Sequence, residues 1–418
     1  MEFHVSLKKS KAFRFKNKFN LCIEKDIITF SKKKSDKNDI IIQVTENTEF
    51  FIQKIKGKEY IVIENGPSLT LKFSSKKKLM KILLALKSTK YANSKLHADD
   101  FKILSYIGQG YFGLVSLAQY KNSNEMFALK RISKSRLYSL KSTNTVLRER
   151  QLLEHLNNKN PFLVKMEFAF QDAENFYIGL EYVSGGNLRH HLKTNGKVSS
   201  IDLKIYLAEI AICLDFLHKE GIIYRDLKPD NVLIASDGHI KLTDFGLSKN
   251  INKNEHTSTF CGTNIYVAPE IITNHEYSYE IDWYQLGVLA YELSFEKAPF
   301  DSSNSKKLME KIINEEPQFL SNADPILVDL IKRLMEKNPK ERMNFDGLKN
   351  HMFFKGFSFD NAFEKKYKPS FIPSKTVSTS TSFFSQIEPE IYENSLLKND
   401  QNLFNGFSFI SDEFNNLL

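Results

Sequence analysis

The chain has 418 residues, enough for roughly two or three domains of ordinary size. Its 41% hydrophobic and 26% charged residues permit a packed core and exclude wholesale disorder. No apolar run is long enough for a membrane-spanning helix, and the first residues do not resemble a secretory signal. The 3 cysteines are widely scattered, which excludes a disulfide framework and a cysteine-based metal site. We therefore expect a cytoplasmic protein.

The net charge of +9 is concentrated at one end of the chain. Residues 1–97 hold 22 Lys and Arg against 9 Asp and Glu, whereas the remainder carries a net charge of −4. A basic module beside a near-neutral one indicates a local anionic partner, either nucleic acid or an anionic lipid surface.

Alternating apolar and polar residues predict short strands near the start of the chain, at 19–23, 40–44, 59–63 and 69–73. The spacing of Leu79, Ile82, Leu83 and Leu86 predicts a helix after them. A mixed α/β region follows, and a tail rich in Phe, Ser and Asn is expected to be extended and partly disordered unless something pins it. The predicted divisions are a β-rich domain at 1–92, a linker at 93–100, the α/β region at 101–354 and the tail at 355–418.

A glycine-rich segment, G-x-G-x-x-G, lies within residues 107–115 and has strand-like sequence on both sides. Such a turn lets backbone amides approach phosphate oxygens, and Lys130 on a later strand could pair with the same phosphates. The alternative is an ordinary tight turn. A buried Lys130 would need a fixed partner, and Glu149, on a helix predicted over 146–156, is the candidate. The alternative for Glu149 is a surface ion pair.

Residues 224–231 (YRDLKPDN) place a carboxylate, a cation and an amide within a few positions, and Asp244 follows in a D-F-G sequence. Phosphoryl transfer needs a divalent metal on the phosphates and a carboxylate near the attacking hydroxyl. Asn231 and Asp244 offer the oxygen ligands that Mg²⁺ prefers. Asp226 would act as the base, and Lys228 would neutralise charge on the transferring group. A solvated polar loop is the alternative.

Together with Ala268-Pro269-Glu270, these motifs occur in the order found in protein kinases, and residues 101–354 resemble the protein kinase catalytic domain. The resemblance implies an α+β, bilobal kinase fold that binds ATP and Mg²⁺ between its lobes. Asp282 resembles the family's buried anchor, and Arg342 could pair with Glu270. Lys228 and Thr263 are typical of the serine/threonine branch, and Thr263 is expected to contact the substrate.

The resemblance also implies the nucleotide-binding residues. The backbone of Glu181 and Val183 would hold the adenine edge, and apolar side chains would cover its faces. The full set is Ile107, Gly108, Gln109, Gly110, Tyr111, Phe112, Gly113, Leu114, Val115, Ala128, Lys130, Glu181, Val183 and Leu233.

Tyr224 in place of the usual histidine, and residues 259–263 (TFCGT), are typical of the AGC group, which contains the cyclic-nucleotide-dependent kinases, protein kinase B and protein kinase C. In this group Thr259 corresponds to the activation-loop phosphorylation site. Residues 404–409 (FNGFSF) match the hydrophobic motif of the group. The aromatic residues of this motif would dock on the small lobe of the kinase; they are Phe404, Phe407 and Phe409. Phosphorylation of Ser408 would strengthen this docking. Ordinary packing is the alternative.

The resemblance implies that Asp230 and Glu292 bind basic residues upstream of the phosphorylated Ser or Thr. Asn187 stands where many relatives have Glu, which weakens the expected selectivity for Arg. The expected partners are therefore protein substrates that carry basic residues before the phosphorylated Ser or Thr, and upstream kinases that activate this protein. We expect the protein to be a monomer.

The N-terminal region resembles a pleckstrin-homology domain, with strands, one following helix and basic residues near its start, although its helix lacks the usual tryptophan. The whole chain thus resembles protein kinase B. The resemblance implies binding to membrane phosphoinositides and recruitment to the inner face of the plasma membrane through Lys8, Lys9, Lys11, Arg14 and Lys16. A solvated basic face is the alternative, and no nucleic-acid-reading motif occurs, so we expect no nucleic-acid partner. The alternatives for the whole chain are a pseudokinase scaffold and a lipid-binding adaptor.

Overall fold

The computed structural model describes residues 2–8, 18–31, 40–45, 48–55, 58–65, 68–72, 79, 82–83, 86, 94–109, 113–139, 143–250, 264–373 and 407–418. The chain divides into two compact units. The first contains the described residues up to Arg150, those from Met166 to Leu180, and residues 407–418. The second contains Gln151–Lys165 and the described residues from Glu181 onward to 373.

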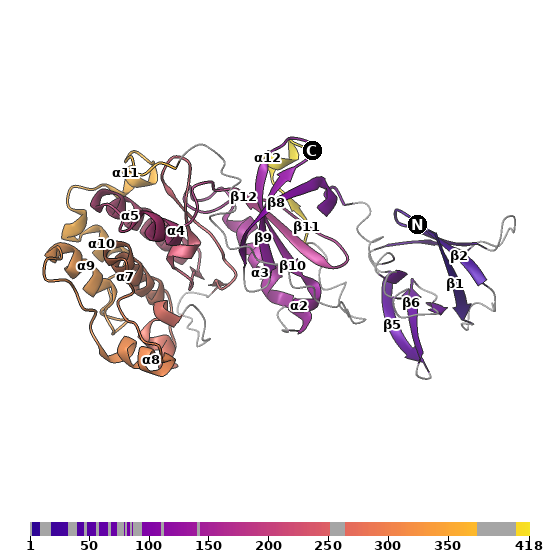
Figure 1. Ribbon diagram of the computed structural model, residues 1–418, viewed down its shortest axis with the longest axis horizontal. Coiled ribbons are helices and arrows are strands. Elements are labelled where there is room, and N and C mark those ends of the chain that lie inside the picture. The colour runs from indigo at the N-terminus through magenta and orange to yellow at the C-terminus, as the bar shows by residue number, and fades with distance from the viewer. Residues whose placement is uncertain are drawn as a thin grey trace. The chain divides into compact units, whose positions relative to one another are not determined.

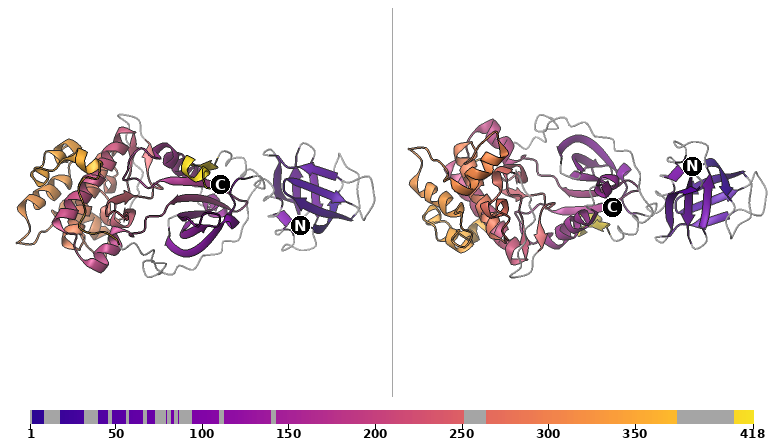
Figure 2. Two further views of the ribbon diagram at one scale, coloured as in Figure 1. Left: turned by 90° about the horizontal axis from the view of Figure 1, so that it is seen from above. Right: turned by 90° about the horizontal axis from the view of Figure 1, so that it is seen from below.

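The N-terminal part of the first unit is a 7-stranded sheet in the order β4-β3-β2-β1-β7-β6-β5. It is the indigo sheet in Figure 2. Its antiparallel strands are β1 Glu2–Lys8, β2 Lys18–Glu24, β3 Ile27–Ser31, β4 Ile40–Gln43, β5 Glu49–Ile55, β6 Lys58–Glu64 and β7 Ser68–Lys72. Two meanders, β1–β4 and β5–β7, join where β1 pairs with β7. The four predicted strands correspond to β2, β4, β6 and β7.

One hydrophobic core holds this sheet together. Ile28 and Phe30 of β3 are fully buried while Ile27 is exposed, which is the alternation expected of a strand with one face inward. Leu79, Ile82, Leu83 and Leu86 are helical and buried in the same core, so the predicted helical spacing is confirmed. The N-terminal part is therefore a β-rich domain with a helical segment.

A second sheet in the first unit has 6 strands in the order β17-β11-β12-β10-β9-β8 (Figure 1). The strands are β8 Phe101–Gln109, β9 Gly113–Tyr120, β10 Met126–Ser133, β11 Met166–Gln171, β12 Asn175–Glu181 and β17 Phe409–Ile410. Helices α2 (Lys134–Ser139) and α3 (Thr143–Leu156) follow β10 in the chain.

The end of the chain contributes to the core of this sheet. Helix α12 (Asp412–Asn415) inserts Phe414 among Phe101, Phe127 and Phe168, and Phe414 is 1% exposed. The ring centroids of Phe414 and Phe168 lie 4.5 Å apart. The tail was expected to be extended unless something pins it, and these last residues are held in a strand and a helix because their aromatic side chains fill an apolar surface.

The second unit is mainly helical, and α5 (Ser200–Lys219) and α7 (Glu280–Phe295) form its centre (Figure 1). Both are buried on nearly all sides, as expected for helices with apolar residues around their whole circumference. No helix in the described part of the chain is long and apolar enough to cross a membrane. The other helices are α4 Leu188–Asn195, α6 Pro269–Ile272, α8 Ser305–Asn314, α9 Pro325–Leu334, α10 Phe345–Lys349 and α11 Phe359–Phe363.

Two short ladders position the polar loop of the second unit. Strand β13 (Ile222–Ile223) pairs with β16 (Lys249–Asn250), and β14 (Val232–Ile234) pairs with β15 (Ile240–Leu242). The loop 224–231 connects β13 to β14, and it includes the short 3-10 helix η3 (Pro229–Asn231). Both ends of the loop are thus fixed by backbone pairing.

Candidate active site

Helix α7 anchors the loop that carries the predicted catalytic residues. Asp282, which is fully buried, accepts hydrogen bonds from the backbone N–H groups of Tyr224 (2.9 Å) and Arg225 (2.8 Å). One turn later, Gln285 accepts from the backbone N–H of Leu227 at 3.0 Å and donates to the carbonyl of Arg225 at 3.1 Å. Arg225 has a left-handed backbone with φ of 69°, which these bonds hold in place.

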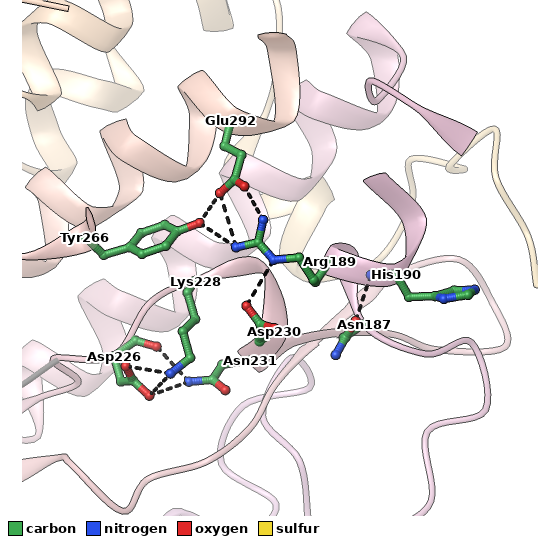
Figure 3. Close-up of polar contacts among 9 residues, drawn as sticks. All are labelled: Asn187, Arg189, His190, Asp226, Lys228, Asp230, Asn231, Tyr266 and Glu292. Carbon is green, nitrogen blue, oxygen red and sulfur yellow. Dashed lines mark hydrogen bonds and ion pairs between the residues drawn. The ribbon is translucent and has the colours of Figure 1, made fainter. Parts of the chain in front are cut away.

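The next residues form a compact hydrogen-bonded cluster around Asp226 (Figure 3). Lys228 Nζ lies 2.7 and 3.0 Å from the two carboxylate oxygens of Asp226. Asn231 Nδ2 donates to one of these oxygens and to the carbonyl of Asp226, both at 2.8 Å. Burial raises the pKa of Asp226, the hydrogen bonds from Lys228 and Asn231 offset part of the rise, and the charge of Asp244 adds to it.

Asp244 and Asn231 lie on segments that are joined directly. The backbone N–H of Thr243 donates to the carbonyl of Asn231 at 3.0 Å. Asp244 has a left-handed φ of 58°, and its Oδ1 accepts from the backbone N–H of Gly246 at 3.3 Å. Because Nδ2 of Asn231 is committed to Asp226, its amide oxygen is the atom that it can present to a cation. A carboxylate and an amide oxygen fit the hard oxygen ligands that Mg²⁺ requires.

Lys130 and Glu149 meet in the first unit. Strand β10 carries Lys130 and α3 carries Glu149, and Lys130 Nζ lies 2.5 Å from Oε1 of Glu149. The two residues are 6% and 4% exposed, so the alternative of a surface ion pair for Glu149 is wrong. Lys130 is directly opposite Val115 on the neighbouring strand β9.

The described residues of the glycine-rich segment lie on the paired strands β8 and β9, in which Gly108 pairs with Val115 and Gln109 with Leu114. A Cβ on Gly113 would lie 2.0 Å from the carbonyl oxygen of Arg131, so only glycine allows this strand to approach β10 so closely. Ile107 lies on the same β8 strand, two residues before its end, and Ala128 lies half-buried on β10. The remaining predicted members, Gly110, Tyr111 and Phe112, lie outside the described residues.

The other predicted nucleotide-binding residues lie in the second unit. Glu181 Oε1 accepts from Lys241 Nζ at 2.6 Å and from the backbone N–H of Lys165 at 2.8 Å, which fixes the start of this segment. Val183 and Leu233 are both half-buried, and Leu233 belongs to β14.

A second carboxylate cluster lies close by in the same unit (Figure 3). Arg189 Nε donates to Asp230 at 3.2 Å, and the other guanidinium nitrogens donate to Glu292 and to the hydroxyl of Tyr266. The Tyr266 hydroxyl in turn donates to Glu292. The two carboxylates predicted to bind substrate, those of Asp230 and Glu292, are therefore brought together, but both bind Arg189 of the same chain.

Arg189 was not among the predicted site residues. It is the second residue of α4, and Asn187, the N-cap of that helix, accepts from the backbone N–H of His190 at 2.9 Å. Arg189 is separated by 41 residues from Asp230 and by 103 from Glu292, so no local spacing reveals the contact. The only sequence signal is a basic residue in the first turn of a helix, where acidic residues are favoured.

The predicted phosphorylation site Thr259 and the predicted substrate contact Thr263 lie outside the described residues. Arg225, on the loop just before Asp226, donates to the carbonyl of Leu247 at 2.7 Å and to the hydroxyl of Tyr277 at 3.2 Å.

The described half of the hydrophobic motif is docked on the first unit. Phe407 is fully buried, with its ring centroid 4.5 Å from that of Phe176. Arg150 donates to the carbonyl of Ser408 at 3.1 Å and lies 5.7 Å from the centre of the Phe409 ring. Phe404 lies outside the described residues. The docked segment places the backbone of Ser408, not its hydroxyl, on Arg150.

Two further sequence expectations concern structural residues and lipid binding. Arg342 binds Glu270 through both carboxylate oxygens, at 2.6 and 3.0 Å, and both side chains are buried, as the resemblance implied. Lys8 ends strand β1. The other predicted lipid-binding residues, Lys9, Lys11, Arg14 and Lys16, lie outside the described residues.

Comparison with known proteins decides the family. The family model of the protein kinase domain matches residues 101–354. The chain belongs to the protein kinase family. Membership implies the use of ATP and Mg²⁺, which the oxygen ligands of Asn231 and Asp244 fit. The match begins at residue 101, so the likeness of the N-terminal domain to a pleckstrin-homology domain stays a prediction.

Relatives are similar over most of this chain. Protein kinase 2 of Dictyostelium discoideum is 36% identical over 75% of this chain and 68% of its own length. The serine/threonine-protein kinase gad8 of Schizosaccharomyces pombe is 38% identical, over 72% of this chain and 53% of its own. The serine/threonine-protein kinase Sgk1 of Gallus gallus is 38% identical, over 68% and 66%. The chain thus spans about half to two thirds of their length, and the predicted class, a serine/threonine protein kinase of the AGC group, is confirmed.

Proposed function

We propose that the protein transfers the γ-phosphoryl group of ATP to Ser and Thr hydroxyls of proteins. The observation that carries this proposal is the cluster in which Lys228 and Asn231 both bind the buried carboxylate of Asp226. A carboxylate held this way has a fixed orientation, which is what a general base or a hydroxyl-positioning group requires.

Each residue of the site has a role that its environment supports. Bound ATP with Mg²⁺ supplies the phosphoryl group and neutralises its charge. Asp226 accepts a hydrogen bond, and then the proton, from the substrate hydroxyl. Lys228 carries positive charge beside this carboxylate, while Asn231 and Asp244 hold the cation. Lys130, oriented by Glu149, binds phosphate oxygens.

Regulation would act through two phosphorylation sites and upstream kinases. Phosphorylation of Thr259 would add roughly two negative charges to the segment before Ala268-Pro269-Glu270. Ser408 lies next to Phe407, whose burial already docks this part of the chain, so phosphorylation there would strengthen an existing contact.

The N-terminal domain would recruit the kinase to anionic phosphoinositide membranes. The support is its excess of basic residues and the predicted cluster from Lys8 to Lys16, which follows strand β1. Clustered Lys and Arg near such a surface contribute on the order of 1 kcal/mol each. Pelleting of the full chain with phosphoinositide vesicles, but not with phosphatidylserine vesicles of equal charge, would support lipid recognition. Equal pelleting would reduce the domain to a generic basic surface.

Phosphorylation of peptides by the purified full chain tests the proposed reaction. With Mg²⁺ and ATP, peptides that differ only in carrying Ser, Thr or Tyr should be labelled on Ser and Thr. Asp244→Asn should abolish labelling, and Asp301→Asn, at an exposed aspartate, should keep it. Nucleotide binding without any labelling would instead identify a pseudokinase scaffold.

A further inference from the structure

The cluster of Asp230 and Glu292 contains its own cation. Arg189 fills it with hydrogen bonds to both carboxylates and to Tyr266 (Figure 3). Burial opposes the charge of Arg189, but the hydrogen bond to Glu292 and the nearby negative charges raise its pKa above the ordinary value. Arg189 is therefore a permanent guanidinium in this site.

Burial decides which carboxylate an incoming group could reach. The side chain of Glu292 is 7% exposed and lies against Arg189 and Tyr266, whereas that of Asp230 is 45% exposed. A basic side chain from a substrate can therefore approach Asp230 directly. It can reach Glu292 only where the Arg189 guanidinium now lies.

The charge balance of the cluster also indicates that it selects weakly for a basic substrate side chain. Two carboxylates and one guanidinium leave a net charge of −1 on the three residues. Asn187 adds no charge, and its side-chain oxygen is committed to capping α4. One partly exposed negative charge selects weakly for a cation, because solvent and salt screen it.

Competition within one chain favours the internal cation. Arg189 reaches both carboxylates without the entropy lost when two molecules associate, whereas a substrate side chain must be ordered to make the same bonds. The planar guanidinium also matches carboxylate geometry as well as any substrate arginine could.

We infer that Arg189 is a specificity-determining residue, which occupies from within the chain the place on Asp230 and Glu292 that a basic substrate side chain would take. The kinase then discriminates little between a basic and a neutral residue at that substrate position. This inference rests on the proposed phosphorylation of Ser and Thr in proteins.

Paired peptides test the inference on the full chain. The two members of each pair are identical except for Arg or Ala at one upstream position, and each upstream position is compared in turn. For the native protein the ratio of kcat/KM between the Arg and Ala peptides should stay below about threefold, in line with a weak exposed charge. In Arg189→Gln the ratio should rise by about tenfold at one position, through a lower KM for the Arg peptide, because two carboxylates become available.

Three further variants separate this effect from structural damage. Lys193→Gln removes a charge from the exposed face of the same helix and should keep the native ratio. Arg189→Lys keeps the charge without the planar fork and should give an intermediate ratio, which serves if Arg189→Gln unfolds. The double variant Arg189→Gln/Glu292→Gln should lose most of the gain, because the gain requires the Glu292 carboxylate.

Two outcomes would overturn the inference. One is an unchanged ratio in folded Arg189→Gln and Arg189→Lys, and the other is a strong preference for Arg in the native protein. Failure of the native protein to label any Ser or Thr peptide is a different result, since it would remove the proposed function and the inference with it.

Discussion

The two carboxylate clusters of the second unit lie at neighbouring positions of one loop, yet they obtain their cations in different ways. Asp226 is bound by Lys228, 2 residues later in the chain. Asp230 is bound by Arg189, 41 residues earlier and on a different element. Lys228 belongs to the same loop motif as Asp226, so this cation cannot be replaced while the motif stays the same. A cation supplied by a distant helix can be replaced while the motif stays the same, so the first cluster suits chemistry and the second suits selectivity.

The largest effect is expected from the first cluster. Asp226→Asn should lower kcat by about 10²- to 10⁴-fold, because the amide cannot accept the proton of the substrate hydroxyl. The thermal midpoint of unfolding should change little, since the raised pKa of Asp226 indicates that burial already disfavours its charged form, and asparagine has the same size. Asp301→Asn is the matched control. Near-native turnover by Asp226→Asn would remove the distinction between the two clusters.

A third buried pair tests how much burial raises the stability that is lost when an ion pair is broken. Glu270→Gln leaves Arg342 buried beside an uncharged group, which should cost about 3–5 kcal/mol in the free energy of unfolding. Asp215→Asn breaks the exposed pair with Lys219 and should cost about 0.5 kcal/mol or less. Denaturant titration measures both. Equal costs would mean that the buried pair contributes no more than a surface pair.

The pH dependence should distinguish the clusters as well. The pKa of Asp226 is raised from 3.8 chiefly by burial, and the base must be ionised to accept a proton. The acid limb of the kcat/KM profile should therefore lie above the ordinary range of aspartate. Lys228→Gln should move that limb to higher pH, because Lys228 lowers this pKa. Arg189→Gln should not move it. An acid limb that shifts in Arg189→Gln instead would mean that the titrating base lies in the second cluster.

The smallest effects are expected at the tail, where docking depends on apolar contacts. Phe407→Ala should lower kcat/KM severalfold, since the side chain is fully buried against Phe176. Ser408→Ala should have a smaller effect, because Arg150 binds its backbone carbonyl, which alanine retains. Peptide phosphorylation by the unphosphorylated chain measures both. A larger loss from Ser408→Ala would mean that its hydroxyl controls docking.

Local spacing predicted the first cluster, because Asp226, Lys228 and Asn231 lie within a short loop that cannot keep them far apart. The resemblance to protein kinases predicted the ion pair between Glu270 and Arg342. Both kinds of signal fail for Arg189, because its partners Asp230 and Glu292 lie on other elements, η3 and α7, that are far from it in the sequence.

The fold shows the same limit. The helix between Leu79 and Leu86 could be predicted because apolar residues recur every three or four positions along its buried face. The strands β1, β3 and β5 were not predicted, and neither were β17 and α12. The two-residue strand β17 carries too little sequence for any periodicity, and it forms because β11 offers an edge to pair with.

That pairing also protects the sheet from association. Without residues 407–418, β11 would present its unpaired backbone N–H and C=O groups along an edge, beside the aromatic surface now covered by Phe414. Exposed edges of this kind recruit strands from other molecules. We therefore expect removal of residues 407–418 to lower solubility, in addition to the loss of activity expected when Phe407 no longer docks.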